Sequence, residues 1–211
     1  MSPLLPILAA ALLALPGLAS ADHITRILDA SGTQHFLDGA RGVAVDAGGT
    51  VYVTGFNNAT AFAIDPAGTI TALIDATGDG QGNDLRRPRS VGVDDAGNVY
   101  VNGGTGNDSV FRIEPSGAIT RILDRSGDGA GNTLYECYEI AVAGDGTVYA
   151  VGVVSDNAFR VDPGGFVTEI IDATGDGAGN ALHMAGGVAV DADDNVYVVG
   201  RGSDNGFKIT P

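Results

Sequence analysis

The residues best suited to chemistry are oxygen-bearing side chains that recur in three glycine-rich segments. Segments 75–83 (DATGDGQGN), 124–132 (DRSGDGAGN) and 172–180 (DATGDGAGN) share one pattern, with oxygen side chains at positions 1, 3, 5 and 9. Hard cations take oxygen ligands, and the glycine at position 6 permits the sharp turn of an EF-hand-like calcium loop. The sequence therefore predicts Ca²⁺ ligands at Asp75, Thr77, Asp79, Asn83, Asp124, Ser126, Asp128, Asn132, Asp172, Thr174, Asp176 and Asn180, with the Gln81 carbonyl as a further candidate.

A structural interpretation of the same loops stays open beside the calcium one. Position 12, where an EF-hand loop has a bidentate Glu, is Arg86, Tyr135 or His183 here. Aspartates in tight turns also accept hydrogen bonds from nearby backbone N–H groups, without any metal. The loops are therefore either modest calcium sites or self-capped turns.

These loops belong to a unit that fills most of the chain. Each follows a short apolar segment that ends in Asp, and a fourth copy of this segment stands near the N-terminus, so the copies occupy residues 24–29, 70–75, 119–124 and 167–172. Their starts recur every 46 to 49 residues. Regular spacing in this range indicates a repeat architecture.

Each unit contains four strand candidates separated by turn residues. The first strands are 43–46, 91–94, 140–143 and 188–191, the second 51–53, 99–101, 148–150 and 196–198, and the third 62–64, 111–113, 159–161 and 207–209. The fourth strand is the segment that ends in Asp. Repeated four-stranded antiparallel units of this length are typical of β-propeller blades. We therefore expect an all-β propeller with four blades of four antiparallel strands, at residues 40–75, 88–124, 137–172 and 185–211 plus 24–29.

The order of strands along the chain predicts how the ring closes. The chain begins with a fourth strand, 24–29, and its last strand is a third strand, 207–209. Pairing of these two would complete the last blade and remove an exposed sheet edge. We therefore expect the N-terminal strand to pair with the C-terminal blade of the same chain, which gives a closed monomer.

Residues 85–101 (LRRPRSVGVDDAGNVYV) resemble the NHL repeat, and the resemblance covers roughly residues 24–211. It implies a β-propeller and, loosely, a binding platform. Pro88 of this pattern is Ala40, Cys137 or Ala185 in the other units, and four blades are fewer than the about six of typical NHL propellers.

The chain is also distantly similar to gluconolactonase and streptogramin-lyase-like propellers. That resemblance implies a metal or a His/Glu pair at the pore mouth, for which Glu139 and His183 are the candidates here. The three histidines, His23, His35 and His183, share no motif, and no Ser or Cys nucleophile pattern accompanies them. We therefore expect a non-catalytic binding scaffold, with a hydrolase or lyase as the alternative and a subunit of a larger propeller assembly as a second alternative.

The ligand is expected where loops gather at one end of the blades. In a propeller, the loops between second and third strands lie on the same face as the glycine-rich loops. The expected ligand face holds Arg41, Arg89, Tyr138, Asp156 and Asp204. Its acidic loops predict an unknown protein, carbohydrate or small molecule as partner.

Composition narrows the partners and the compartment. A net charge of −15 argues against binding to nucleic acid or to anionic membranes. The apolar run 4–15, followed by residues 19–21 (ASA), predicts a signal peptide over 1–21 that is cleaved after Ala21. Residues 22–211 would then form one secreted or periplasmic domain without a membrane segment. The single cysteine, Cys137, allows no intrachain disulfide and is expected to pack as a small apolar residue.

Overall fold

The computed structural model describes residues 25–28 and 36–211, so the expected signal peptide lies outside it. All regular secondary structure in these residues is β-strand, arranged as antiparallel meanders. Three sheets have four strands each: β1 (Ala40–Val45), β2 (Val51–Gly55), β3 (Thr60–Ile64) and β4 (Ile70–Ile74); β5 (Val91–Val93), β6 (Val99–Gly103), β7 (Ser109–Ile113) and β8 (Ile119–Leu123); β9 (Cys137–Val142), β10 (Val148–Gly152), β11 (Asn157–Val161) and β12 (Val167–Ile171). The last sheet has three: β13 (Ala185–Val190), β14 (Val196–Gly200) and β15 (Asn205–Ile209).

Tight hairpins connect the strands because the turn residues satisfy the backbone locally. In the second sheet, the Asp94 carboxylate accepts a hydrogen bond from Asn98 N at 2.8 Å, and Gly97 takes the left-handed conformation with φ of 82°. An L side chain is disfavoured at that φ, whereas glycine adopts it freely. The same arrangement recurs at Asp46, where the carboxylate accepts from Thr50 N at 2.9 Å. Asp, Asn and Gly residues thus stabilise the turns between these strands.

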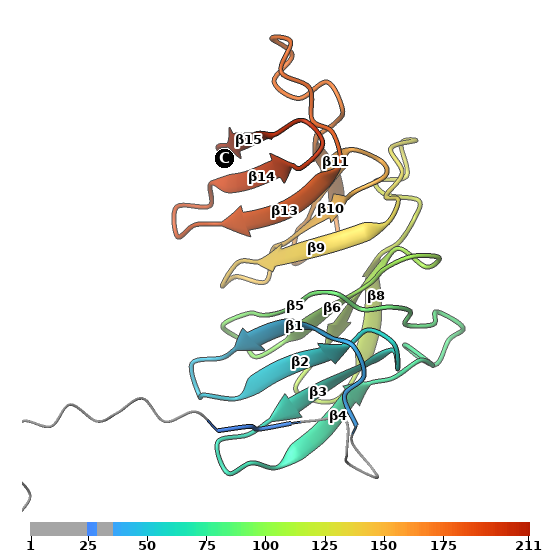
Figure 1. Ribbon diagram of the computed structural model, residues 1–211, viewed down its shortest axis with the longest axis vertical. Helices are drawn as coiled ribbons and strands as arrows, with labels where there is room; N and C mark the ends of the chain where they lie inside the picture. The colour runs from blue at the N-terminus through green and yellow to red at the C-terminus, as the bar shows by residue number, and fades with distance from the viewer. Residues whose placement is uncertain (1–24, 29–35) are drawn as a thin grey trace, which may run out of the picture.

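The four sheets form an arc in chain order. Strand β1 contacts β5, β5 contacts β9, and β9 contacts β13, so the first strand of every sheet lies on the inner side. Figure 1 shows the β1–β4 sheet at one end of this arc and the β13–β15 sheet at the other. The four sheets are the predicted blades.

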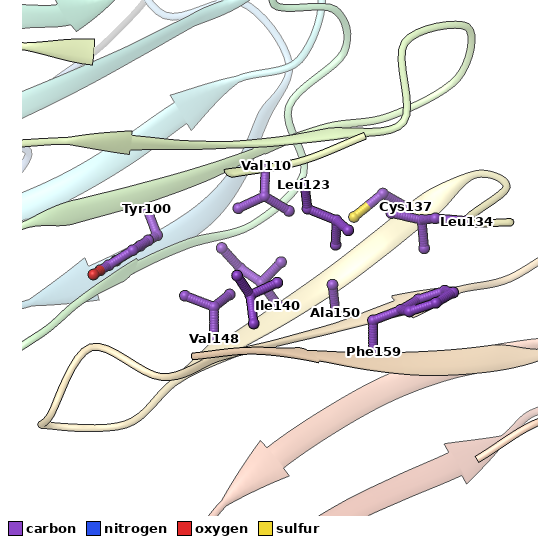
Figure 2. Close-up of a cluster of buried hydrophobic side chains, with 10 residues drawn as sticks. Tyr100, Val110, Leu123, Leu134, Cys137, Ile140, Val148, Ala150 and Phe159 are labelled. Carbon is purple, nitrogen blue, oxygen red and sulfur yellow. The ribbon is translucent and has the colours of Figure 1, made fainter. Parts of the chain in front are cut away.

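The core lies between neighbouring sheets. One apolar cluster joins Tyr100 and Leu123 of the second blade to Ile140 and Phe159 of the third (Figure 2). Cys137 belongs to this cluster, and complete burial raises the pKa of its thiol to about 12. The tyrosines and phenylalanines that recur in the second and third strands of the first three blades are buried: Tyr52, Tyr100, Tyr149, Phe62, Phe111 and Phe159.

The predicted closure of the ring within one chain is not detected. Residues 25–28 form no strand, and β15 is the outer strand of a three-stranded sheet. Residues 25–28 lie at the first-sheet end of the arc in Figure 1, whereas the C-terminus lies at the opposite end. The segment therefore lies away from the edge that it was expected to fill.

Across residues 25–28 and 36–211, no helix has the length and apolar character needed to span a membrane.

Candidate functional site

A pocket opens at the inner edge of the arc, where the first strands of three blades begin. Its volume is about 350 Å³. We call it the central pocket, and its lining residues are Arg41, Gly42, Val43, Arg89, Ser90, Tyr138 and Glu139. Three residues of the expected ligand face, Arg41, Arg89 and Tyr138, thus line one pocket.

Four arginines lie near two aromatic rings at the inner edge of the arc. The Phe56 ring has the guanidinium of Arg41 at 4.5 Å, that of Arg89 at 5.6 Å and that of Arg87 at 5.7 Å from its centroid. The Tyr138 ring has Arg89 at 4.6 Å and Arg201 at 5.2 Å. We call Arg41, Arg87, Arg89 and Arg201 the arginine row. Contact between a guanidinium group and an aromatic face does not require the in-plane N–H donors of the arginine.

The arginine row differs from three other arginines, which form ion pairs with carboxylates. Arg86, Arg112 and Arg121 form ion pairs with Asp84, Glu114 and Asp124 at 3.0, 3.1 and 3.0 Å. Within the described residues, no carboxylate lies within 4.0 Å of a guanidinium nitrogen of the arginine row. In a chain with a net charge of −15, this leaves a local concentration of unneutralised positive charge.

Arg89 is the most firmly placed member of the row. The buried Asn102 side chain accepts hydrogen bonds from Arg89 N at 2.9 Å and from Ser90 N at 2.8 Å. Asn102 also donates to the Cys137 carbonyl at 2.9 Å, so it ties the second blade to the third. The Nε atom of Arg89 is buried and has no hydrogen-bond partner among the described residues. A bound acceptor would satisfy such a donor.

Glu139 brings the only carboxyl group among the residues that line the central pocket. Burial raises the pKa of Glu139 above its ordinary 4.5, while a hydrogen bond from the Val188 backbone opposes the shift. Desolvation disfavours the charged form of a carboxyl group. The protonated form of Glu139 therefore persists to higher pH than in water, which reduces its repulsion of an anion in the pocket.

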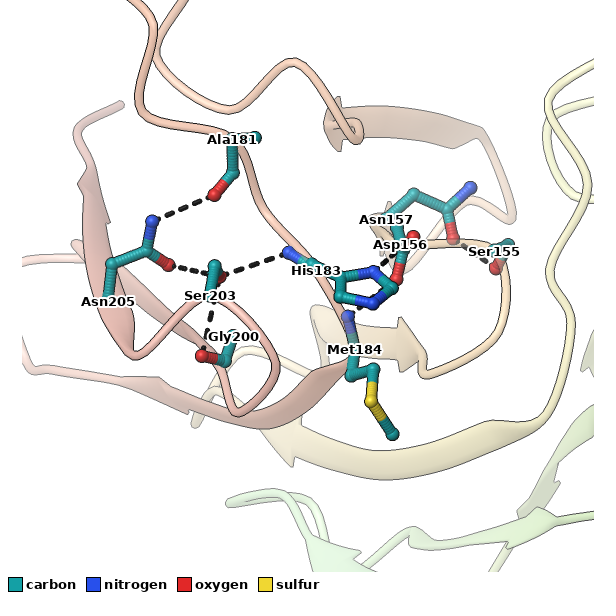
Figure 3. A network of polar contacts seen from close by, with 9 residues as sticks. All are labelled: Ser155, Asp156, Asn157, Ala181, His183, Met184, Gly200, Ser203 and Asn205. Carbon is teal, nitrogen blue, oxygen red and sulfur yellow. Dashed lines mark hydrogen bonds and ion pairs between the residues drawn. The ribbon is translucent and has the colours of Figure 1, made fainter.

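Polar contacts connect the loops around the start of β13. The Asp156 carboxylate accepts from Met184 N at 2.6 Å and lies 3.0 Å from His183 Nδ1, while His183 N donates to Ser203 Oγ at 3.1 Å (Figure 3). Asn205 then bonds the Ala181 carbonyl at 2.8 Å. Asp156 and His183 thus join the third blade to the fourth.

The structure gives the two catalytic candidates separate partners. Glu139 faces the central pocket, whereas the His183 ring bonds Asp156 and is more than half exposed. A general acid–base pair needs both groups within reach of one substrate. The structure thus places Glu139 in the lining of the central pocket and His183 outside that lining, and a Glu139–His183 pair remains a prediction.

The three glycine-rich loops satisfy their carboxylates internally. Asp75 accepts from Thr77 N at 2.8 Å and Thr77 Oγ1 at 2.6 Å, and Asp79 accepts from Asn83 Nδ2 at 2.6 Å. The loops that begin at Asp124 and Asp172 repeat this pattern. No group of three or more His, Cys, Asp or Glu side chains in the described part of the chain is placed to hold a metal ion. These bonds match the self-capped turn, and calcium remains a prediction for these loops.

Sequence reasoning missed half of the site. Phe56, Arg87 and Arg201 come from different blades, and none stands out by its motif. Of the other expected ligand-face residues, Asp156 lies in the loop network, and Asp204 occupies the equivalent loop of the fourth blade, outside the central pocket. A search for arginines and aromatics near the start of each first strand would have found part of the arginine row.

Comparison with known proteins shows the fold. No known family's sequence profile matches the chain, and no curated protein is similar to it in sequence. The NHL resemblance therefore stays a prediction. Solved structures do match: a streptogramin B lyase has 13% identity and a TM-score of 0.61, with 82% of this chain and 52% of that chain covered.

Two further matches have different activities in their names. A gluconolactonase from Xanthomonas campestris has 18% identity and a TM-score of 0.58, with 82% of this chain and 58% of that chain covered. An auxiliary nutrient binding protein from Bacteroides thetaiotaomicron has 12% identity and a TM-score of 0.59, with coverage of 79% and 46%. At these identities the likeness shows a β-propeller type of fold and no activity. The chain spans about half the length of these structures.

Proposed function

We propose that the chain is a non-catalytic binding module that takes a small carboxylate-bearing ligand in the central pocket. The observation that carries this proposal is the arginine row, whose four guanidinium groups stack on Phe56 and Tyr138 without a carboxylate partner among the described residues. Planar guanidinium groups bind carboxylates through paired N–H donors. The sequence predicted a ligand face with acidic loops, whereas the arginine row is positively charged. Only part of the site was therefore predicted.

The pocket supports binding better than catalysis. Arg41 and Arg89 supply donors, Tyr138 supplies an aromatic wall, and Glu139 is the one titratable acid in the lining. A hydrolase or lyase that used Glu139 and His183 together would need both groups at one substrate, whereas His183 contacts Asp156 and is not among the residues that line the pocket. The volume of about 350 Å³ fits a small molecule.

A thermal-shift titration tests the proposal. Citrate and benzoate serve as carboxylate probes, glucose as a neutral one, and sodium chloride of equal ionic strength as the control for screening. We expect the carboxylates to raise the melting temperature saturably in the wild type and much less in Arg89→Ala and Arg41→Ala. The matched control is Arg86→Ala, because Arg86 is exposed and already paired with Asp84.

The outcomes separate the proposal from its alternatives. If carboxylates stabilise the protein no more than sodium chloride does, or if Arg86→Ala weakens the effect as much as Arg89→Ala, the central pocket is not the site. Hydrolysis of a lactone or ester that is lost in Glu139→Gln would instead favour the enzyme alternative.

We also propose that the chain is exported. The apolar run 4–15 and the ASA sequence at 19–21 support cleavage of a signal peptide and secretion or transfer to the periplasm. Sequencing the N-terminus of the exported protein tests this, and we expect it to begin at Asp22.

A further inference from the structure

We propose that a second copy of this chain packs head-to-tail against the two open ends of the arc, so that two chains form one eight-bladed ring. In this ring, residues 25–28 of each copy add the fourth strand to the β13–β15 sheet of the other. The proposal is independent of the ligand, because it depends on the ends of the arc and not on the arginine row.

The first end of the arc exposes a surface that packs against the preceding sheet in the other three blades. Val43 and Val45 of β1 are 70% and 62% exposed. The equivalents of Val43 are buried at Val91 and Ile140 and half-buried at Val188. The equivalents of Val45 are half-buried and pack against the same apolar clusters between sheets: Val93, Val142 and Val190. We call the exposed surface of Val43 and Val45 the leading face. It is apolar like the surfaces that meet between blades, and no sheet among the described residues covers it.

The other end exposes the complementary surface. Along β14 the burial alternates strictly, so that Val196 and Val198 are buried whereas Tyr197 and Val199 are 39% and 49% exposed. The equivalents of Tyr197 and Val199 in the third blade, Tyr149 and Val151, are buried against the fourth blade. We call the surface of Ala189, Tyr197 and Val199 the trailing face.

The internal seams show how the two faces fit. Between the second and third blades, Tyr100 of the trailing side packs against Ile140 and Val148 of the leading side. Each contact between neighbouring blades, here called a seam, joins a trailing face to a leading face. One copy of the chain exposes one face of each kind, so two copies can form further seams with each other. A contact between unlike faces generates rings or filaments. One chain spans about half the length of the matching propeller structures, and two copies would supply one ring.

A polar contact at the loops points the same way. Asp108 and Asp156 occupy equivalent positions in the second and third blades, with φ of 44° and 54°. Each accepts a hydrogen bond from the backbone at the start of the next blade. Asp108 accepts from Cys137 N at 3.4 Å, and Asp156 accepts from Met184 N at 2.6 Å. Asp204 occupies the same position in the fourth blade with φ of 52°. No such hydrogen bond reaches Asp204 from the described residues. In the ring, the backbone at the start of β1 of the second copy would donate it.

The free edge of β15 fixes the register of the added strand. In the three complete blades, the threonine in the second position of the fourth strand pairs with Ala63, Arg112 or Arg160. The equivalent pair is Thr25 with Lys208. An exposed sheet edge is a template for a strand of another chain. Because residues 25–28 and β15 lie at opposite ends of the arc, this pairing joins two chains.

Light scattering of the exported protein gives the first test. We expect a mass of twice that of one chain at micromolar concentration. A monomer overturns the proposal and would leave both faces to some other partner or segment. A trimer or an open-ended series also overturns it, because two copies would then not close the ring.

Charged substitutions on the two faces test the head-to-tail arrangement. Val43→Asp and Val199→Asp should each halve the mass, whereas Val154→Asp should not, because Val154 is an exposed valine in a loop away from both faces. Mixing Val43→Asp with Val199→Asp should restore dimers, since one wild-type seam can then form. Dimers that survive either substitution, or a mixture that stays monomeric, would contradict the proposal.

A disulfide trap tests the strand exchange. Thr25→Cys combined with Lys208→Cys should give a covalent dimer on oxidation, and Thr25→Cys alone should not. Cys137 does not interfere because it is buried. A disulfide within one chain would show closure of a four-bladed monomer instead and would overturn the exchange.

Discussion

Tyr100 and Tyr197 occupy the same position in the second and fourth blades, yet their surroundings differ. Each donates its hydroxyl to an aspartate, Tyr100 to Asp94 and Tyr197 to Asp191, at 2.9 Å in both cases. Tyr100 is 2% exposed and Tyr197 is 39% exposed. The local sequence thus sets the conformation of the side chain, and the neighbouring blade sets its burial. The same sequence unit is core in one place and surface in another.

Truncating the two tyrosines should give the largest difference. Tyr100→Ala removes a ring from a packed seam, and we expect a loss of about 3–5 kcal/mol of unfolding free energy, as for other large aromatic truncations. The cost of Tyr197→Ala should depend on protein concentration, because the proposed second copy would bury the Tyr197 side chain. Urea unfolding at two protein concentrations measures both. Equal, concentration-independent losses would show that the fourth blade is not completed by association.

Added methyl groups on the inner strands should destabilise a packed seam more than the exposed trailing face. A Cβ on Gly92 would lie 2.5 Å from Val142 Cγ2, across the seam between the second and third blades. We expect Gly92→Ala to cost about 1–3 kcal/mol, the usual range for an overpacked core. Ala189→Val, on the trailing face, should leave the unfolding free energy of the monomeric Val43→Asp background unchanged. Chemical denaturation compares the two, and a tolerated Gly92→Ala would mean that the seam adjusts.

Acid should weaken the Asp191–Tyr197 pair in a defined pH window. A hydrogen bond from the Asn195 side chain, with further bonds from backbone N–H groups and Tyr197, lowers the pKa of Asp191 to about 2 from 3.8. Because the unfolded chain binds this proton more readily, the stabilisation is fully present above about pH 3.8 and is lost as the pH falls through about 2. Urea midpoints between pH 2 and 6 should show this slope, and Asp191→Ala should flatten it. An unchanged slope would assign the acid sensitivity to other carboxylates.

The smallest effect is expected in the glycine-rich loops. Asp79→Ala removes the acceptor for Gln81 N and Asn83 Nδ2, so the melting temperature should fall by a few degrees. If the carboxylates act only as caps, calcium and EDTA will not change this difference. Calorimetry with calcium checks the other interpretation: a saturable heat that Asp79→Ala abolishes would establish the loop as a calcium site.

The blades could be predicted from the sequence because their determinants are local. Alternating Val, Tyr and Val segments and Asp–Gly turns each specify a strand or hairpin within a few residues, as at 91–101. Closure within one chain was predicted from strand order and is not detected, because strand order alone does not define how the sheets are placed relative to one another. The arginine row was only partly predicted, because Arg87 and Arg201 stand in no motif and approach Phe56 and Tyr138 only in the folded chain.

The burial of Cys137 has a practical consequence. Its thiol is enclosed between the second and third blades, and its pKa of about 12 leaves almost no thiolate at neutral pH. The folded chain should therefore be inert to maleimides and other alkylating reagents until that seam separates. The native sequence carries a built-in reporter of opening: the rate of alkylation under native conditions measures how often the two halves of the arc come apart, without any engineered label.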